Sequence, residues 1–225
     1  MFSYRAMTQL FAFAACITLV AERAEANLIT NGSFESGTFV NDGNGTDSFG
    51  PGPTAITGWA AVGRQVSWIQ TPNPWGLLAQ DGTHFLDLTG YQTGAPFGGV
   101  TQNIVTTVGQ QYDLSFYLGS YTQRWGGPPV SILAAAGATT QTFTVSTTST
   151  ASTWTPFSMH FTANSANTAI TLTGAAGVEY IGLDNVSVDL ASAVPEPESW
   201  ALMVLGLGSL VWIGLRRNTN RSISK

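Results

Sequence analysis

The chain has almost no cysteine. Its single thiol, Cys16, lies in an N-terminal segment that carries the features of a removable export signal, described below. The rest of the chain therefore offers no disulfide, no thiolate metal ligand and no cysteine nucleophile. An exported domain of this kind has to be stable through its hydrophobic core alone, and one domain's length of chain is enough to form such a core.

Positive charge is equally scarce. Between residues 27 and 194 the basic residues are Arg64 and Arg124, against nine acidic residues, which gives a net charge of −7. Such a surface repels the phosphates of nucleic acids and has no basic patch to offset the repulsion. We therefore expect no nucleic-acid partner. The same segment is rich in aromatic and β-branched residues, which argues against a disordered chain.

Helical periodicity and catalytic motifs are also missing. Residues 27–194 show no sustained 3.6-residue repeat of apolar positions. His84 and His160 are the only histidines, and there is no His-Glu-x-x-His, Gly-x-Ser-x-Gly or nucleotide-binding loop. The spacing of the acidic residues does not favour a glycosidase pair. We therefore expect a protein that is not an enzyme.

The start of the chain, residues 1–26, reads as a secretory signal peptide. Arg5 supplies the positive charge, Leu10 to Val20 form the apolar core, and Ala24-Glu25-Ala26 is a small-x-small cleavage site. The mature chain is predicted to begin at Asn27.

The C-terminus carries a second signal. A linker, residues 191–199, precedes an apolar run, residues 200–215, and a basic tail, residues 216–225. The run has 16 residues, fewer than the roughly 20 of a spanning helix. A transmembrane helix here needs local thinning of the bilayer or extension of Arg216 and Arg217 toward its surface. The basic tail predicts a cytoplasmic C-terminus, and an ordinary short tail anchor is one interpretation.

The linker supports a sharper interpretation through Val194, Pro195, Glu196 and Pro197. Two prolines fix φ and remove two donors, so this stretch is extended and accessible. With the apolar run and the arginines after it, the motif resembles the PEP-CTERM sorting signal of Gram-negative bacteria. The resemblance implies recognition by an exosortase, removal of the helix, and a membrane-anchored precursor that ends at the cell surface or in an extracellular polysaccharide matrix.

Between the two signals, residues 27–190 contain short β-rich runs separated by Gly, Pro, Asn and Asp. Apolar and polar residues alternate in 111–118 and in 157–162, which predicts burial on one face and hence antiparallel sheets packed face to face. About ten strands in one domain suggest an all-β jelly-roll sandwich. Polar loops are predicted at 41–54 and 119–129. The predicted strands are Leu28–Asn31, Thr57–Val62, Val66–Ile69, Thr83–Leu88, Val100–Val105, Gln111–Leu118, Val130–Ala134, Gln141–Val145, Thr155–Thr162, Ala169–Thr173 and Leu183–Leu190.

Several motifs in this domain follow a recognisable order: Asn27-Leu28-Ile29-Thr30-Asn31-Gly32-Ser33-Phe34-Glu35, then Ile56-Thr57-Gly58-Trp59, Phe85-Leu86-Asp87-Leu88-Thr89-Gly90, Gln111-Tyr112-Asp113-Leu114-Ser115-Phe116 and Leu183-Asp184-Asn185-Val186-Ser187-Val188. They resemble the choice-of-anchor C domain, which is related to a plant cell-wall domain of unknown function with a galactose-binding-like fold. The resemblance implies a galactose-binding-like jelly roll at the cell surface or in the matrix. Its plant relatives associate with cell-wall polysaccharide.

Glu35 and Asp184 are the predicted metal ligands. Glu35 ends the first motif and Asp184 lies in the last strand, and the first and last strands of a jelly roll often pair. Carbohydrate-binding modules of the implied fold commonly hold a structural Ca²⁺ at this edge, and calcium prefers hard oxygen ligands. The alternative is that the two carboxylates cap turns or accept backbone amides.

A group of aromatic residues supplies the candidate carbohydrate-binding site. The C–H face of a sugar lies well on a flat ring, and binding residues collect on loops at the rim of a rigid sandwich. Arg124, beside Trp125, is placed to bond an acidic sugar. The alternative is that these rings seal the core under long loops, which we expect for Trp59 and Trp154. The candidate rings are Trp68, Trp75, Tyr91, Tyr121 and Trp125.

Two functions remain open on these residues. The first is an exported, non-catalytic carbohydrate-binding module, sorted by an exosortase, with extracellular polysaccharide as its partner. The alternative is a structural or adhesive matrix protein with no defined sugar site. The acidic composition and the lack of catalytic motifs fit both functions.

Overall fold

A computed structural model of the protein describes residues 27–74, 76–90, 94–121, 127–146, 150–191 and 206–207. The chain divides into two units, residues 1–190 and 191–225. The predicted signal peptide and nearly all of the predicted transmembrane helix lie outside the described residues, although Gly206 and Leu207 are helical. Among the residues that are described, no helix has the length and apolar character needed to cross a bilayer.

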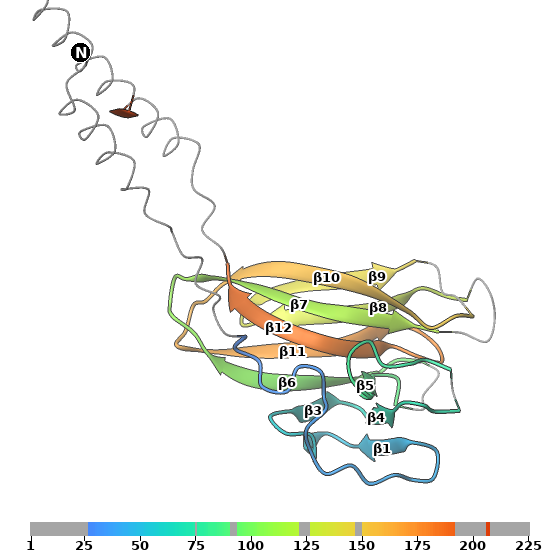
Figure 1. Cartoon of the computed structure of the whole chain (residues 1–225). Coiled ribbons are helices and arrows are strands. Elements are labelled where there is room, and N and C mark those ends of the chain that lie inside the picture. Colours follow the sequence, from blue (N-terminus) through green and yellow to red (C-terminus); the bar gives the residue numbers. More distant parts are fainter. Residues whose placement is uncertain are drawn as a thin grey trace, which may run out of the picture. The chain divides into compact units, whose positions relative to one another are not determined.

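The first unit is built from two antiparallel sheets of six strands each, counted over the described residues. The first sheet has the order β1 (Thr46–Phe49), β4 (Val66–Gln70), β5 (His84–Asp87), β12 (Gly182–Leu190), β7 (Gln111–Ser120) and β10 (Thr153–Thr162). The second has the order β2 (Gly52–Pro53), β3 (Ala60–Gly63), β6 (Gly98–Val105), β11 (Asn167–Ala176), β8 (Val130–Ala136) and β9 (Thr139–Val145). Figure 1 shows the two sheets stacked as layers. The predicted all-β sandwich is confirmed.

Alternation along the strands explains why the sheets face each other. In β7 the side chains of Tyr112, Leu114, Phe116 and Leu118 are buried, whereas the residues between them are half-buried or exposed. These side chains meet the inner face of the second sheet, including Ile132 of β8, in one continuous hydrophobic core. Burial of this apolar surface is the main contribution to the stability of a domain without disulfides.

The segment predicted as a strand at Leu28–Asn31 is not one, and this prediction was wrong. The segment nevertheless lies along β12, because the Leu28 N–H donates to the Val188 carbonyl (2.8 Å) and the Val186 N–H donates to the Gly32 carbonyl (2.9 Å). Residues 28–31 form bends instead of a strand, and Asn31 has a φ of 57°. Residues 28–32 are thereby held against the last strand, as expected for this type of sandwich.

The predicted loop 41–54 contains two short strands, β1 and β2, that sequence patterning missed. The chain reaches β1 through Asx turns: Asn41 Oδ1 accepts the N–H groups of Gly43 (2.8 Å) and Gly45 (2.9 Å), and Asp42 Oδ1 accepts that of Asn44 (2.8 Å). Side-chain bonds of this kind favour turns over regular structure, so a polar, glycine-rich composition concealed a paired strand.

Residues 71–80, which we call the 71–80 loop, cover part of the outer face of the first sheet. Leu77 is fully buried there in a second small cluster with Ile69, Phe85 and Tyr180. Two glycines make room for this packing. A Cβ at Gly119 would lie 2.5 Å from the Trp154 ring, and a Cβ at Gly182 would lie 2.8 Å from Leu77.

Candidate functional site

The carboxylate of Glu35 is held by the residues that lead into β5. Its Oε1 accepts the backbone N–H groups of Thr83 (2.9 Å) and His84 (2.6 Å). Its Oε2 accepts the Thr83 hydroxyl (2.9 Å) and faces Nδ1 of His84 at 3.1 Å. Partial burial raises the pKa of Glu35, but the bonds from His84 and Thr83 outweigh it and the pKa lies below its usual value.

The His84 ring has a defined place beside this carboxylate. Its centroid lies 5.1 Å from those of Trp68 and Phe39. Its Nε2 is buried and has no hydrogen-bond partner among the described residues. We assign the proton to Nδ1, where Glu35 accepts it, because an unprotonated nitrogen is less costly to bury alone than an N–H.

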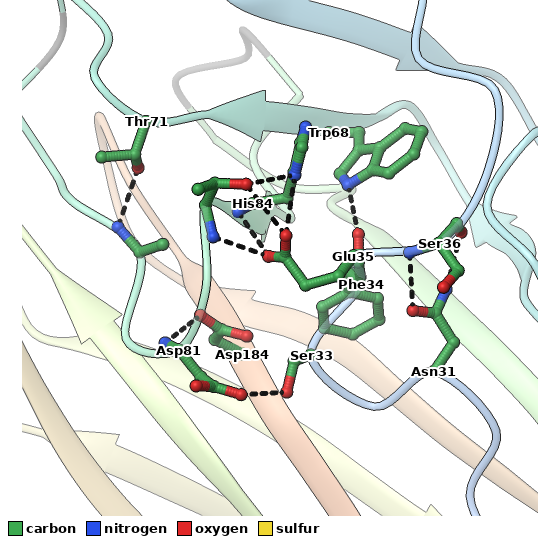
Figure 2. Close-up of polar contacts among 12 residues, drawn as sticks. Asn31, Ser33, Phe34, Glu35, Ser36, Trp68, Thr71, Asp81, His84 and Asp184 are labelled. Carbon is green, nitrogen blue, oxygen red and sulfur yellow. Dashed lines mark hydrogen bonds and ion pairs between the residues drawn. The ribbon is translucent and has the colours of Figure 1, made fainter.

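Asp184 holds the other side of the same segment. Its Oδ2 accepts the N–H groups of Gln80 (2.8 Å) and Asp81 (3.1 Å), and its Oδ1 accepts that of Asn185 (2.7 Å). Its side chain is fully buried, and burial raises its pKa to about 7 despite the three N–H donors, with the charge of Asp81 adding to the increase. Figure 2 shows Asp184 beside Asp81 and Glu35 beside His84, along the turn that joins those two residues.

We call Glu35, Asp184 and residues 80–84 the carboxylate clamp. Sequence reasoning paired Glu35 with Asp184, and the structure brings both to this one segment, where each accepts backbone amides. Gly82 completes the fit, since a Cβ there would lie 2.5 Å from Cδ of Glu35. Within the described residues, no group of three or more His, Cys, Asp or Glu side chains is close enough to hold a metal ion.

Asp87 is a further buried carboxylate, besides the two predicted metal ligands. Its oxygens accept the N–H and hydroxyl of Thr89 (3.0 and 2.7 Å) and the N–H of Ile181 (3.1 Å). Burial raises its pKa to about 6. The Asp-x-Thr spacing is the only sequence signal for this turn, and its partner Ile181 lies 94 residues away.

The candidate aromatic residues differ in their burial, and some lie outside the described residues. Trp68 is 1% exposed and its indole N–H donates to the Phe34 carbonyl (2.9 Å), so its ring lies in the core and offers no face to a sugar; this prediction was wrong. Trp59 is buried in the core, as expected. Trp75, Tyr91, Arg124 and Trp125 lie outside the described residues.

Tyr121 is the one predicted ring that the structure describes near the surface. It is half-buried, and its ring lies against Gly76, where a Cβ would be 2.5 Å from Cζ. Trp154 is also half-buried, and its indole N–H donates to the Leu78 carbonyl (2.8 Å). Both rings therefore contact the 71–80 loop, and the residues next to Trp75 and next to the 122–126 segment meet at one rim of the sandwich.

Two open hollows lie at the edges of the sheets within the described residues. One, of about 480 Å³, lies between residues 41–45 and residues 70–74. The other, of about 520 Å³, lies between residues 53–60 and residues 101–103 of β6. Sequence reasoning named neither of them.

Comparison with known families decides the classification. Residues 27–182 match the family model described as "Protein of unknown function (DUF642)". The chain belongs to the DUF642 family. Residues 193–218 match the PEP-CTERM protein-sorting motif, which confirms the prediction made from Val194 to Pro197. The DUF642 domain accounts for the sandwich, and the sorting motif for the segment after it.

Among curated proteins, Halomucin from Haloquadratum walsbyi (strain DSM 16790 / HBSQ001) is 30% identical over 170 residues, which cover 73% of this chain and 2% of Halomucin. The DUF642 chain thus spans a very small part of that relative. Among solved structures, TmCBM61 in complex with beta-1,4-galactotriose has a TM-score of 0.48 at 15% identity, covering 74% of this chain and 99% of that one. A family 35 carbohydrate binding module from Clostridium thermocellum has a TM-score of 0.40 at 16% identity, covering 59% and 92%.

Proposed function

We propose that the DUF642 domain is a non-catalytic carbohydrate-binding module that is exported and sorted into an extracellular polysaccharide matrix. The observation that supports it most is the rim at the 71–80 loop, where Tyr121 and Trp154 both contact the loop that carries Trp75. Aromatic rings with polar neighbours on the rim of a rigid scaffold suit the mixed apolar and hydroxyl surface of a sugar.

The test is glycan binding by the purified full-length protein in detergent. Saturable binding is expected, and Tyr121→Ala, Trp75→Ala or Trp125→Ala should each lower the affinity by about tenfold, equivalent to about 1.4 kcal/mol. A conservative Tyr121→Phe variant should retain most of the binding, because it keeps the ring. A folded protein that binds no glycan would contradict the proposal and favour a structural matrix role.

We also propose that the C-terminal motif determines the localisation of the protein. The sorting motif supports export across the inner membrane of a Gram-negative bacterium, recognition by an exosortase, and release or re-anchoring at the surface. Replacing Pro195, Glu196 and Pro197 by alanine should leave the precursor at its unprocessed mass in the host. If that variant has the same mature mass as the wild type, processing by an exosortase at this motif is excluded.

We also propose a structural calcium ion at the carboxylate clamp. The chemistry of the two predicted ligands suits a hard cation, since Glu35 and Asp184 supply only oxygen atoms. Within the described residues, the buried Asp184 accepts one hydrogen bond at Oδ1, which leaves a lone pair there. A cation at this position would stabilise a buried negative charge. Its contribution would be to the stability of the folded state.

Melting with and without a chelator tests the calcium proposal. Chelation should lower the melting temperature of the wild-type protein and have no effect on Asp184→Asn. Glu35→Gln should reduce the chelator effect in the same way. Equal melting temperatures with calcium and with chelator, in the wild type, would mean that the N–H donors alone satisfy the two carboxylates.

A further inference from the structure

The hollow between residues 41–45 and 70–74 differs from the rest of the surface in its side chains. Four carboxamides line it: Asn41, Asn44, Gln70 and Asn73. No charged side chain of the described residues lines it. At about 480 Å³ its volume falls within the roughly 300–1,000 Å³ of small-molecule sites. Its lining residues flank β1 and include the end of β4, and β1 is the edge strand of the first sheet (Figure 1).

The amides in this hollow are not all used by the fold. Asn73 is used, because its Nδ2 donates to the Leu77 carbonyl (2.8 Å) and its Oδ1 accepts the Gly76 N–H (3.2 Å). The side-chain amides of Asn44 and Gln70 have no hydrogen-bond partner in the described part of the chain, and Gln70 is half-buried. Neither amide is among the buried side-chain atoms of the described residues that have no partner, so both are open to solvent and available to a ligand.

The backbone around these amides is set in place without a ligand. Asx turns at Asn41 and Asp42 fix residues 43–45, and the Gln70 N–H donates to the Gly45 carbonyl (2.7 Å), which joins the two walls. A preformed site loses less conformational entropy on binding than a flexible one. Pro72 and Pro74 add apolar surface beside the amides.

The chemistry of the hollow selects a kind of ligand. A carboxamide carries two N–H donors and one oxygen acceptor, so it bonds two adjacent hydroxyl groups well. The acidic residues Asp42 and Asp47 lie in the same stretch of chain as Asn44 and repel anions. Arg64, the one arginine among the described residues, precedes β4, at the end of that strand opposite to Gln70.

The other hollow lacks this combination. Its buried amide, Gln102, is already paired with the backbone of Thr30 through Nε2 (2.9 Å) and Oε1 (2.7 Å). The Thr54 hydroxyl is bound to the Trp59 carbonyl (2.8 Å). Asn103 is the one exposed amide there. This other hollow is therefore not proposed as a second site, and its exposed Asn103 provides a matched control.

We propose that the hollow between residues 41–45 and 70–74 is the glycan-binding site of the domain, and that Asn44 and Gln70 bind hydroxyl groups of an uncharged polysaccharide. This rests on the carbohydrate-binding function proposed above. Asn73 is a positioning residue, which holds the 71–80 loop and does not itself bind the sugar. Asn73 bonds the backbone of Gly76 and Leu77, and the Tyr121 ring lies against Gly76, so the hollow and the aromatic rim share the 71–80 loop.

The experiment is a titration of the full-length protein in detergent with galactan, xylan and the uronic acid polymer polygalacturonate. At least one neutral polymer should bind saturably, and polygalacturonate should bind more weakly. Asn44→Ala and Gln70→Ala should each lower the affinity by about threefold to tenfold, the loss expected for one neutral hydrogen bond. Asn103→Ala should leave it unchanged, and the melting temperature of each variant checks its fold.

The outcomes separate the site from the function. Wild-type affinity in the Asn44→Ala Gln70→Ala double variant, with binding lost in Tyr121→Ala, would overturn the site and leave the carbohydrate-binding function standing. A preference for polygalacturonate would overturn the neutral specificity. A folded protein that binds none of the three polymers would overturn the site and count against the function as well.

Discussion

Glu35 and His84, 49 residues apart in the chain, are joined at two points: Oε1 of the glutamate accepts the backbone N–H of His84 at 2.6 Å, and Oε2 faces the ring Nδ1 at 3.1 Å. This pair, with the two bonds from Thr83, attaches the motif at residues 27–35 to the start of β5. It follows that the carboxylate has a structural role whether or not it also binds a ligand.

Replacing Glu35 by Gln should lower the free energy of unfolding by about 1–3 kcal/mol, because a donor group would then face the N–H of Thr83 or His84. The side chain is 34% exposed, so the lower part of this range is expected. Urea unfolding measures the change. Glu179→Gln, which alters an exposed glutamate, is the matched control, and an equal small effect of the two substitutions would contradict a role for the clamp.

Gly82→Ala should act through Glu35. Gly82 has φ of 65° and Gly43 has φ of 102°, so alanine is strained at both positions, but only at Gly82 would the added Cβ meet the Glu35 carboxylate. We expect Gly82→Ala to cost about 1–3 kcal/mol more than Gly43→Ala. In a double-mutant cycle, Gly82→Ala should have a smaller effect in the Glu35→Ala background. Full additivity would show that the two positions are independent.

The buried Asp184 should make stability depend on pH. Burial raises its pKa from 3.8 to about 7, so between those values the folded protein binds more protons than the unfolded chain. Its contribution is therefore fully present below pH 3.8 and is lost as pH rises through about 7. In a chelating buffer, unfolding free energy should fall from pH 5 to pH 8, by up to a few kcal/mol.

Asp184→Asn isolates this group, because the other titrating side chains are common to both proteins. The difference in unfolding free energy between wild type and variant should change across pH 5 to pH 8 in chelator. Asp87, whose pKa is raised to about 6, should produce the same sign of dependence at slightly lower pH. A difference that does not vary with pH would mean that Asp184 keeps the same protonation in both states.

Trp154→Ala should release the 71–80 loop. The substitution removes the ring that lies against Gly119 and the bond to the Leu78 carbonyl. A loss of about 2–4 kcal/mol is expected for a half-buried tryptophan, with faster amide hydrogen exchange in residues 76–80. Trp154→Phe keeps a ring without the indole N–H and should lose less. Unchanged exchange in Trp154→Ala would show that Leu77 alone fixes the loop.

Strands that are buried on one face only could be predicted from the sequence. In β7 and β10 the apolar residues alternate, and Leu114, Phe116, Met159 and Phe161 are buried as their spacing predicts. The boundaries shifted by a few residues because backbone pairing continues past the last apolar side chain. This part of the fold depends on local periodicity, which a single sequence contains.

β4 shows where this reasoning fails. Val66, Ser67, Trp68 and Ile69 are all buried, because the core covers one face of the strand and the 71–80 loop covers the other. Alternation then carries no information, and Trp68 could not be distinguished from a surface ring. The cover over the second face comes from a loop whose docking depends on glycines in two distant strands.

The candidate site was only partly predictable for a related reason. The pairing of Glu35 with Asp184 followed from the closeness of the first and last segments. Their partners, Thr83 and His84 for one and Gln80 and Asp81 for the other, come from the middle of the chain. Contacts between backbone amides and distant carboxylates leave no periodic trace. The amide-lined hollow was equally hidden, inside a segment that composition describes only as polar.

The place of β12 has a mechanical consequence. This strand lies inside the first sheet, paired with β7 along its length and with β5 near its start, and Ala191 after it leads into the sorting motif. A force applied through the tail would act along the strand axis and load the hydrogen bonds to β7 together, in shear, instead of opening them one after another. A domain pulled through such a strand resists extraction.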